Sequence, residues 1–575
     1  MSSYHETFRL APWVLAYAVG IGLHKIWSPP SVVAIILVLL VTVLLGVGRL
    51  RHALGALWTA CAFFLLISFG WTSASRTSSA TCSSHELLEV LDMGRIKGRF
   101  VQYECRSVLD ECRGLILIAS EKAQPEIGEI IRVEGDESGF NESVFPFEFD
   151  EVRYAESKGW TFRLWCWSWE KVRPGAIPVR WQLNSRIDEW PATDRTKGFY
   201  KALLLGSKTD IASSDKANFS NAGLVHILAV SGLHVGLIAW MLQFIVGKLL
   251  PKKWRWIQVI FVISGLWGFA WIAGMSSSVV RAALLFSLIQ LARLEGREAR
   301  TSEAVWMAGF IILAFDPSSL FDLGFQLSFM AVFGIVYGHS QVQRLFFNEL
   351  KFVKRRIFEA LSVSFWAQLA TTPFTLFYFH QFPNYFLLSN LLLLPLIPIL
   401  LCVGIVALMI QYLWNLPLVF WRILDWVIDV FFSLVHWIAH WPGAVTEGVF
   451  PSVLQSVTLV VLLILTFLIL HTRIKTWLYV LPIFALGLIS FESPKSGEVY
   501  HFNYRGLQGI EVWHGDSATV FLSDTSQWSK VEYATRVWHQ SARIKFIHLK
   551  PLPQHFEPLQ TDTLFPLSSL SPLSP

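Results

Sequence analysis

Polar side chains that could bind an oxyanion or move a proton occur inside long apolar stretches of this sequence. One such stretch holds His226, Ser231 and His234, with Gly232 directly after the serine. A serine and a histidine three residues apart could suggest nucleophilic catalysis, but the segment has no GxSxG elbow and no obvious third member. Three interpretations therefore stay open: a catalytic pair, helix packing through small residues, or the lining of a pore or gate.

A second group combines hydroxyls with a cation. Ser277 lies at the start of an expected helix, and Arg281 follows about one turn later. Serine at a helix N-terminus caps free N–H groups, so a capped helix with an arginine near the interface is one interpretation. The other is that Arg281 meets a phosphate or an acidic partner in an aqueous cavity, because its planar guanidinium binds oxyanions with two hydrogen bonds.

Two further segments place polar or helix-breaking residues inside apolar stretches. Asp322 could cap the first turn of a span that contains Gln326. Gln368 opens a segment with prolines that continues through Asn390 to Pro395. Ordinary packing between helices explains these residues as well as a functional role does, although broken helices are common where backbone lines a cavity or a transport site.

The elements that must position these side chains are membrane helices. The 575 residues are 53% hydrophobic and only 15% charged, against roughly 25% charged residues in soluble proteins. Lipid must therefore be the solvent for much of the chain. The net charge of +5 is small for this length and does not by itself imply a nucleic-acid partner.

A span needs about 20 apolar residues to cross the hydrocarbon core. The sequence predicts a polytopic α-helical membrane protein with about 13 transmembrane helices and one inserted, extracytoplasmic β domain. The expected spans are Ala11–Gly22, Ser31–Gly48, Leu54–Trp71, Ala222–Val246, Ile257–Ala273, Val279–Leu294, Ala304–Phe315, Phe321–Tyr337, Ala360–Phe379, Tyr385–Tyr412, Leu418–Ile438, Val453–Leu470 and Trp477–Ile489.

Composition divides the chain into five parts. Residues 1–73 are N-terminal transmembrane helices, and residues 74–194 form a soluble, mostly β domain whose strand-like runs alternate with turns. Residues 195–412 and 413–491 carry the remaining spans, and residues 492–575 form a polar tail. In the β domain, Cys105 and Cys112 flank an expected hairpin and are the best pair for a disulfide, with two unpaired thiols as the equal alternative.

The orientation follows from loops rich in Lys and Arg. With these spans, all five such loops fall on one side, which we expect to be cytoplasmic. The N-terminus is then cytoplasmic, whereas the β domain and the C-terminal tail are extracytoplasmic. The apolar N-terminal segments lack a convincing small-residue cleavage site, so we do not expect a cleavable signal peptide.

Residues 195–412 closely resemble the ComEC family, the inner-membrane channel of bacterial DNA uptake. The string "HILAVSGLHVGL" matches the most characteristic segment of that family, and "ALLLGSKTDI", "GMSSSVVRAALL" and "DPSSLFDLGFQLSFMAVFGI" are similar to its other blocks. The soluble region 80–170 resembles the OB-fold-like domain of the family more weakly. Between Glu86 and Glu170 it holds 18 acidic and 10 basic residues, so a strand-binding barrel and a mere scaffold both stay open.

The resemblance implies a pore for single-stranded DNA during natural transformation, in the bacterial inner membrane. Under it, the pore or DNA-path candidates are His226, Ser231, Gly232, His234, Ser277, Arg281, Asp322, Gln326, Gln368 and Asn390. The chain has no GxxxxGK[ST], so a separate cytoplasmic motor or strand-binding proteins must drive transport, with a separate DNA receptor outside.

Long members of the family also carry a metallo-β-lactamase-like domain. Here about 85 residues follow Ile489, without an HxHxDH string. We therefore expect no hydrolase, no metal and no cofactor. Two other classes stay open: a membrane transporter or enzyme acting on another anionic substrate, such as a lipid head group or oligosaccharide, and a membrane-embedded scaffold.

Overall fold

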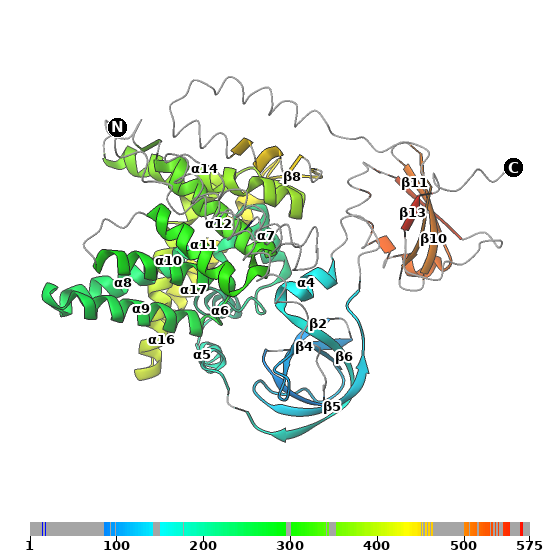
Figure 1. The fold of residues 1–575 in the computed structure, drawn as a ribbon, viewed down its shortest axis with the longest axis horizontal. Helices are drawn as coiled ribbons and strands as arrows, with labels where there is room; N and C mark the ends of the chain where they lie inside the picture. Colours follow the sequence, from blue (N-terminus) through cyan, green and yellow to red (C-terminus); the bar gives the residue numbers. More distant parts are fainter. Residues whose placement is uncertain are drawn as a thin grey trace, which may run out of the picture.

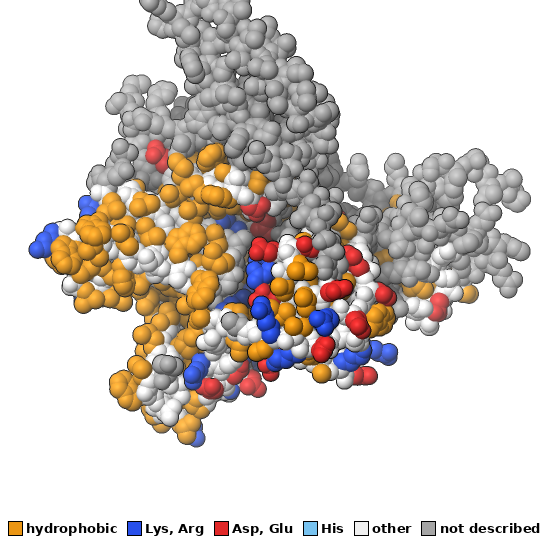
Figure 2. Space-filling model, turned by 60° about the horizontal axis from the view of Figure 1, so that its bottom comes forward, with side chains coloured by type: hydrophobic (Ala, Val, Ile, Leu, Met, Phe, Trp, Pro, Cys, Tyr) orange, Lys and Arg blue, Asp and Glu red, His pale blue; other side chains and the backbone are white. Residues whose placement is uncertain are grey.

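A computed structural model gives three folded parts: a β barrel, a helical domain and a C-terminal sheet (Figure 1). It describes most of residues 86–141, residues 150–175, 177–294, 301–340 and 352–449, and parts of 451–463 and 499–566, together with Val14 and Ala18. Figure 2 shows hydrophobic side chains over the helical domain and mixed acidic and basic side chains over the barrel. The two surfaces have the chemistry expected for lipid and for water.

The barrel is a closed sheet of five strands with one short addition. Its strands are β1 (Leu87–Val90), β2 (Arg95–Lys97), β3 (Phe100–Ser107), β4 (Arg113–Ala119), β5 (Ile130–Glu137) and β6 (Trp160–Arg173). Strand β1 pairs with both β3 and β5, which closes the sheet, and β4 runs parallel to β6. Helix α4 (Glu151–Lys158) precedes β6. The strand-like runs predicted in this region are confirmed as strands.

Of the two alternatives for Cys105 and Cys112, the structure has the two unpaired thiols and not the disulfide. Cys105 pairs across the ladder with Gly114, whereas the carbonyl of Cys112 accepts from the backbone N–H of Ser107. Cys105 therefore lies opposite Gly114, and not directly opposite Cys112, in the antiparallel ladder. Cys105 is fully buried in the barrel core, and burial raises the pKa of its thiol well above the usual range.

Three short helices link the barrel to the membrane helices. They are α5 (Val179–Asp188), α6 (Asp194–Leu205) and α7 (Ser213–Asn221). Helix α6 is almost entirely buried within the main hydrophobic core. Its Lys201 lies 2.6 Å from Asp188 and 2.5 Å from Asp210, so the one buried ammonium of this helix is paired on both sides.

The helical domain contains a succession of apolar helices. They are α8 (Gly232–Leu249), α9 (Arg255–Ile272), α10 (Ser277–Leu294), α11 (Thr301–Phe315), α12 (Leu323–Phe333), α14 (Phe352–Phe379), α15 (Phe386–Leu393), α16 (Leu396–Leu413) and α17 (Leu418–Ala439). Of the described helices, α8, α9 and α10 are long and apolar enough to cross a membrane, and α15 with α16 makes a fourth such element, bent by 44°. Two shorter apolar helices span Thr301–Phe315 and Leu323–His339.

Several predicted spans need correction. The expected span Ala222–Val246 is not one helix, because a 3₁₀ turn (Val225–Ile227) and an extended residue at Ser231 precede α8. The break expected at Pro395 is confirmed by the bend between α15 and α16. Pro373, by contrast, stays inside the continuous helix α14. The spans within 1–73 and 453–489 lie wholly or mostly outside the described residues, so the count of 13 stays a prediction.

Two helices depart from simple spans. A π-helical segment, Gly334–His339, follows α12 and packs closely on α14, since a Cβ on Gly334 would lie 2.3 Å from the backbone oxygen of Trp366.

Helix α17 was predicted as a span, yet it is not among the described helices that are long and apolar enough to cross a membrane. One side of α17 is buried in the core, and another exposes polar residues, namely Arg422, Asp429, Ser433, His436 and His440.

The C-terminal part is a five-stranded sheet in the order β12-β11-β10-β9-β13. Its strands are β9 (Val499–Tyr504), β10 (Leu507–His514), β11 (Ser517–Leu522), β12 (Phe546–Pro551) and β13 (Leu564–Pro566). The tail was predicted to have a few strand-like runs, and the structure places two of these on β10 and β11. In its core, the carboxylate of Glu511 accepts from Trp513 at 2.6 Å and lies 2.7 Å from the imidazole of His539.

Candidate functional site

The starts of three helices meet in the helical domain. Helices α8, α10 and α12 alternate with α9 and α11, so they run in the same direction, and α10 packs against both of the others. A Cβ on Gly232, the first residue of α8, would lie 3.8 Å from Ala282 of α10. A Cβ on Gly324 of α12 would lie 3.5 Å from the hydroxyl of Ser277, the first residue of α10. We call this junction of three N-termini the helix-start cluster.

The start of α8 is held by a reciprocal cap. The Ser231 side chain accepts from the backbone of His234, while the backbone N–H of Ser231 donates to Nδ1 of His234 at 3.0 Å. The Ser231 hydroxyl is also 2.8 Å from that nitrogen. Because Nδ1 accepts from the backbone, the proton of a neutral ring sits on Nε2. That Nε2 is buried and has no hydrogen-bond partner among the described residues.

The predicted arrangement of the two histidines differs from the structure. A continuous helix would hold their side chains ~12 Å apart along its axis. In the structure the chain breaks between them, with His226 in a 3₁₀ turn and His234 in the first turn of α8. His226 is exposed in the 3₁₀ turn, whereas His234 is 1% exposed. The histidine accessible to solvent is therefore the one outside the helix.

Arg281 is the charged centre of the helix-start cluster. It is 5% exposed, and its Nη2 donates to the backbone oxygen of Gly324 at 2.7 Å. Its Nη1 lies 3.9 Å from Oδ2 of Asp322, and its Nε is buried with no hydrogen-bond partner among the described residues. Asp322 caps α12, as predicted, by accepting from the backbone N–H of Phe325 at 2.9 Å. The arginine is therefore held at a helix start with unused donor capacity.

The backbone conformation of the turn before α10, and the contact of this turn with Arg180, were not predicted from the sequence. Gly274 and Met275 both have positive φ, of 77° and 50°. A Cβ on Gly274 would lie 2.4 Å from Nη1 of Arg180, which belongs to the linker helix α5. A non-glycine residue at positive φ costs free energy and is common at functional sites. The glycine in "GMSSS" was the available sequence signal, but its contact with Arg180 depends on tertiary structure.

The remaining predicted residues are dispersed. Gln326 donates to the backbone oxygen of Leu320 at 3.0 Å, and its Oε1 is buried without a partner among the described residues. The Oδ1 of Asn390 on α15 is also buried without a hydrogen-bond partner among the described residues. Gln368 on α14 accepts from nearby threonine hydroxyls through its backbone. None of the described contacts brings Gln368 or Asn390 to the helix-start cluster, so their pore roles stay predictions.

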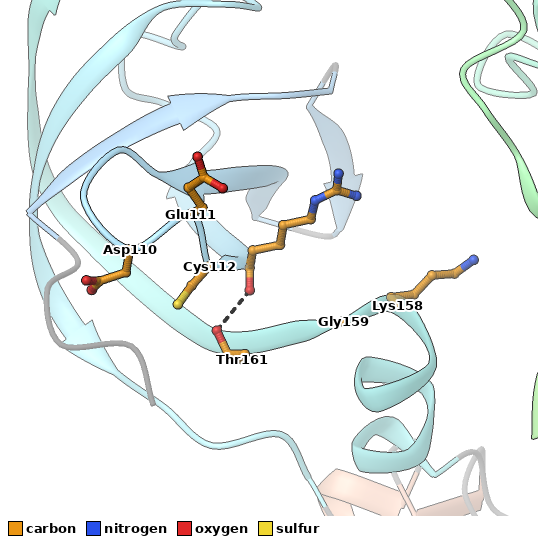
Figure 3. Close-up of a pocket in the computed structure, with 7 residues that line it drawn as sticks. Asp110, Glu111, Cys112, Lys158, Gly159 and Thr161 are labelled. Atoms are coloured by element: carbon orange, nitrogen blue, oxygen red, sulfur yellow. Dashed lines mark hydrogen bonds between the residues drawn. The ribbon is translucent and has the colours of Figure 1, made fainter. Parts of the chain in front are cut away.

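A separate hollow of about 400 Å³ opens on the barrel (Figure 3). It is lined by Asp110, Glu111, Cys112, Arg113, Lys158, Gly159 and Thr161. Figure 3 shows the hydroxyl of Thr161 donating to the backbone oxygen of Arg113, at 3.1 Å. Charges of both signs border this open hollow, which gives no preference for a ligand of either sign. Among the described residues, no group of three or more His, Cys, Asp or Glu could hold a metal ion.

The apolar helices, the broken span and the buried Arg281 together define a polytopic membrane protein with a polar centre at its helix starts. Comparison with known proteins then gives the family. Residues 203–473 match the family model described as "Competence protein". The chain is 27% identical to ComE operon protein 3 of Bacillus subtilis over 265 residues, which are 45% of this chain and 33% of that protein.

A second relative is Competence protein ComA of Neisseria gonorrhoeae, 23% identical over 283 residues, which are 44% of this chain and 38% of that protein. An uncharacterized protein of Aquifex aeolicus is 28% identical over 189 residues, 33% of this chain and 44% of that protein. No solved structure matches the chain. The matched stretches thus cover less than half of each relative. The matched region, residues 203–473, contains the helix-start cluster, and these likenesses support a competence protein of the ComEC family.

Proposed function

We propose that this protein conducts single-stranded DNA across the bacterial inner membrane during natural transformation. The observation that carries the proposal is the convergence of three helix N-termini on the buried Arg281. The match to the family model of competence proteins and the likeness to Competence protein ComA and ComE operon protein 3 support a role in DNA uptake. The path is an aqueous passage among the helices from α8 to α16, entered at the helix-start cluster.

The electrostatics of the cluster suit a polyanion. Each helix N-terminus carries roughly half a positive charge, which favours anions within about one turn. Three such ends meet beside a guanidinium whose Nε–H has no partner among the described residues. A phosphate needs N–H donors and positive potential, and the cluster offers both without a nucleotide-binding loop. An unpaired strand presents its phosphates one after another, so one site can serve each in turn.

The finer features of the protein belong to the same proposal. About 13 spans place the cluster, the barrel and the C-terminal sheet on the extracytoplasmic side. The closed order of the barrel, with β4 parallel to β6, supports an OB-like domain. We further propose that the protein is not a hydrolase. A receptor outside the cell membrane and a cytoplasmic motor or strand-binding protein supply the strand and the driving force.

The direct test replaces Arg281 by alanine in a transformable host. Uptake of labelled DNA should fall about 10- to 100-fold, since a hydrogen bond to a charged group contributes about 1.5–3 kcal/mol. Arg293→Ala is the matched control, because Arg293 is an exposed arginine near the other end of α10. Equal amounts of both variants in the membrane exclude a folding defect. Unchanged uptake with Arg281→Ala would remove the role of this arginine.

Gene deletion separates DNA from other anionic substrates. If the substrate is DNA, deletion abolishes transformation and leaves the envelope composition normal. A changed lipid or oligosaccharide composition with normal transformation would instead indicate a transporter or enzyme for those molecules.

A further inference from the structure

The neighbour of Arg281 raises a question that DNA conduction alone does not answer. Asp322 places a carboxylate 3.9 Å from the guanidinium, at the point where an incoming phosphate would be held. The side chain of Arg281 is 6% exposed and that of Asp322 is 25% exposed. The aspartate is thus the member of the pair that solvent, or an incoming strand, reaches first.

The carboxylate is fixed rather than mobile in this structure. Its Oδ2 accepts from the backbone N–H of Phe325 at 2.9 Å, which ties it to the start of α12. Arg281 is tied to the same turn through the carbonyl of Gly324 at 2.7 Å. Both charged groups are therefore anchored to the start of α12. Their separation stays at 3.9 Å because each of them also makes a hydrogen bond to the backbone of this helix.

The space around Gly324 shows how little room remains for a second anion. A Cβ on Gly324 would lie 2.9 Å from Oδ2 of Asp322, 3.5 Å from the hydroxyl of Ser277 and 3.6 Å from Nη2 of Arg281. Three polar groups thus surround a gap that is too small even for a methyl group without movement of the carboxylate. A phosphate oxygen placed at this gap, in contact with Arg281 and Ser277, would have to take the place of the Asp322 carboxylate.

We propose that Asp322 is a built-in competitor that sets the affinity of the helix-start cluster for backbone phosphates. This inference rests on the proposed conduction of DNA. Conduction requires a site that binds well enough for entry and weakly enough for release. Asp322 meets that need, because its fixed carboxylate lies beside Arg281, the only buried arginine among the described residues. Each phosphate must displace this carboxylate to bind Arg281, and the carboxylate then displaces the phosphate again.

The test uses the full-length protein in lipid nanodiscs and a labelled oligonucleotide of thymidines. Asp322→Asn removes the charge and retains a side chain that caps a helix start about as well. The variant should bind the oligonucleotide about ten-fold more tightly, and the slope of log K against log salt should steepen by about 0.7, as expected for one more phosphate contact on a single strand. In cells, the tighter site should release the strand more slowly, and uptake of labelled DNA should fall.

Asp316→Asn is the matched control, since Asp316 also caps a helical turn through Ser318 and has no arginine partner among the described ion pairs. It should change neither the affinity nor the salt slope. If Asp322→Asn does not accumulate, Asp322→Ser gives the same readout, because serine is also a good cap.

The outcomes separate the two proposals. Unchanged or weaker binding by the Asp322 variant, with normal binding by the native protein, overturns the role of Asp322 and leaves conduction standing. Failure of the native protein to bind the oligonucleotide, together with normal transformation after deletion of the gene, overturns the proposed function itself.

Discussion

The barrel and the helix-start cluster handle charge in opposite ways. The barrel region has many charges, 18 acidic and 10 basic between Glu86 and Glu170. Several of its cations are already paired at the surface: Arg106 lies 2.6 Å from Glu89, and Arg132 lies 3.8 Å from Glu170. The cluster has one buried cation, Arg281, with one carboxylate, that of Asp322, 3.9 Å away. The number of charges is therefore a poor guide to where a polyanion binds.

Dielectric environment explains the difference. Exposed ion pairs are screened by water and salt and contribute little. A buried guanidinium interacts with an anion through a medium of much lower effective dielectric, so one charge there outweighs several at the surface. Helix N-termini add to the effect in the cluster, whereas sheets have only small net dipoles. The predictions below test this comparison, from the largest expected effect to the smallest.

Ser277→Asp should lower DNA uptake while it stabilises the protein. A carboxylate at the start of α10 favours the helix by about 0.3–1 kcal/mol. The same charge beside Arg281 repels phosphate, and about 1.4 kcal/mol of repulsion gives a ten-fold loss of uptake. Thermal melting and uptake of labelled DNA measure the two effects. The neutral Ser277→Asn is the control, and a loss of uptake that tracks a loss of stability would contradict this account.

Arg132→Ala in the barrel should have a small effect. Its ion pair is exposed, with 57% of the arginine side chain and 78% of the glutamate side chain accessible. Loss of the pair should change the free energy of unfolding by less than about 1 kcal/mol, and uptake should stay near the native value. A fall in uptake as large as that of Ser277→Asp would show that the barrel also guides the strand.

Cys105 should be inert to thiol reagents in the folded protein. It is fully buried, and its pKa is raised by burial and then by the neighbouring Glu104 carboxylate, so the reactive thiolate is scarce at neutral pH. Mass spectrometry after maleimide treatment should find Cys105 unmodified until the protein is denatured. Rapid labelling of the native protein would mean that the barrel core opens readily.

Local signals in the sequence predicted much of the helix-start cluster. The apolar runs gave most of the described helices, and Asp322 before an apolar run predicted the cap on α12. Gly232 directly follows Ser231 within the expected span, and the structure starts α8 at this glycine. These features depend on residues within one or two turns, which is the range over which caps and breaks act.

Other features depend on distant parts of the chain and could not be predicted. The Arg281–Asp322 pair joins two helices, and Gly324 matters because Ser277 and Arg281 approach it from α10. Pro373 lies in a segment for which a broken helix and ordinary packing were both open, and α14 continues through it. The polar side of α17 was not predicted, because the segment is apolar on average. Its charged residues lie on one stripe of an otherwise apolar helix.

The central claim is that the DNA strand passes the helix-start cluster. A photoreactive phenylalanine derivative in place of Phe321 tests it most directly, because this exposed ring directly precedes Asp322. The same derivative in place of Phe261, an exposed ring on α9, is the control. Illumination during uptake should crosslink transforming DNA at position 321 and not at 261. Absence of a crosslink at 321 in cells that take up DNA normally would contradict the account.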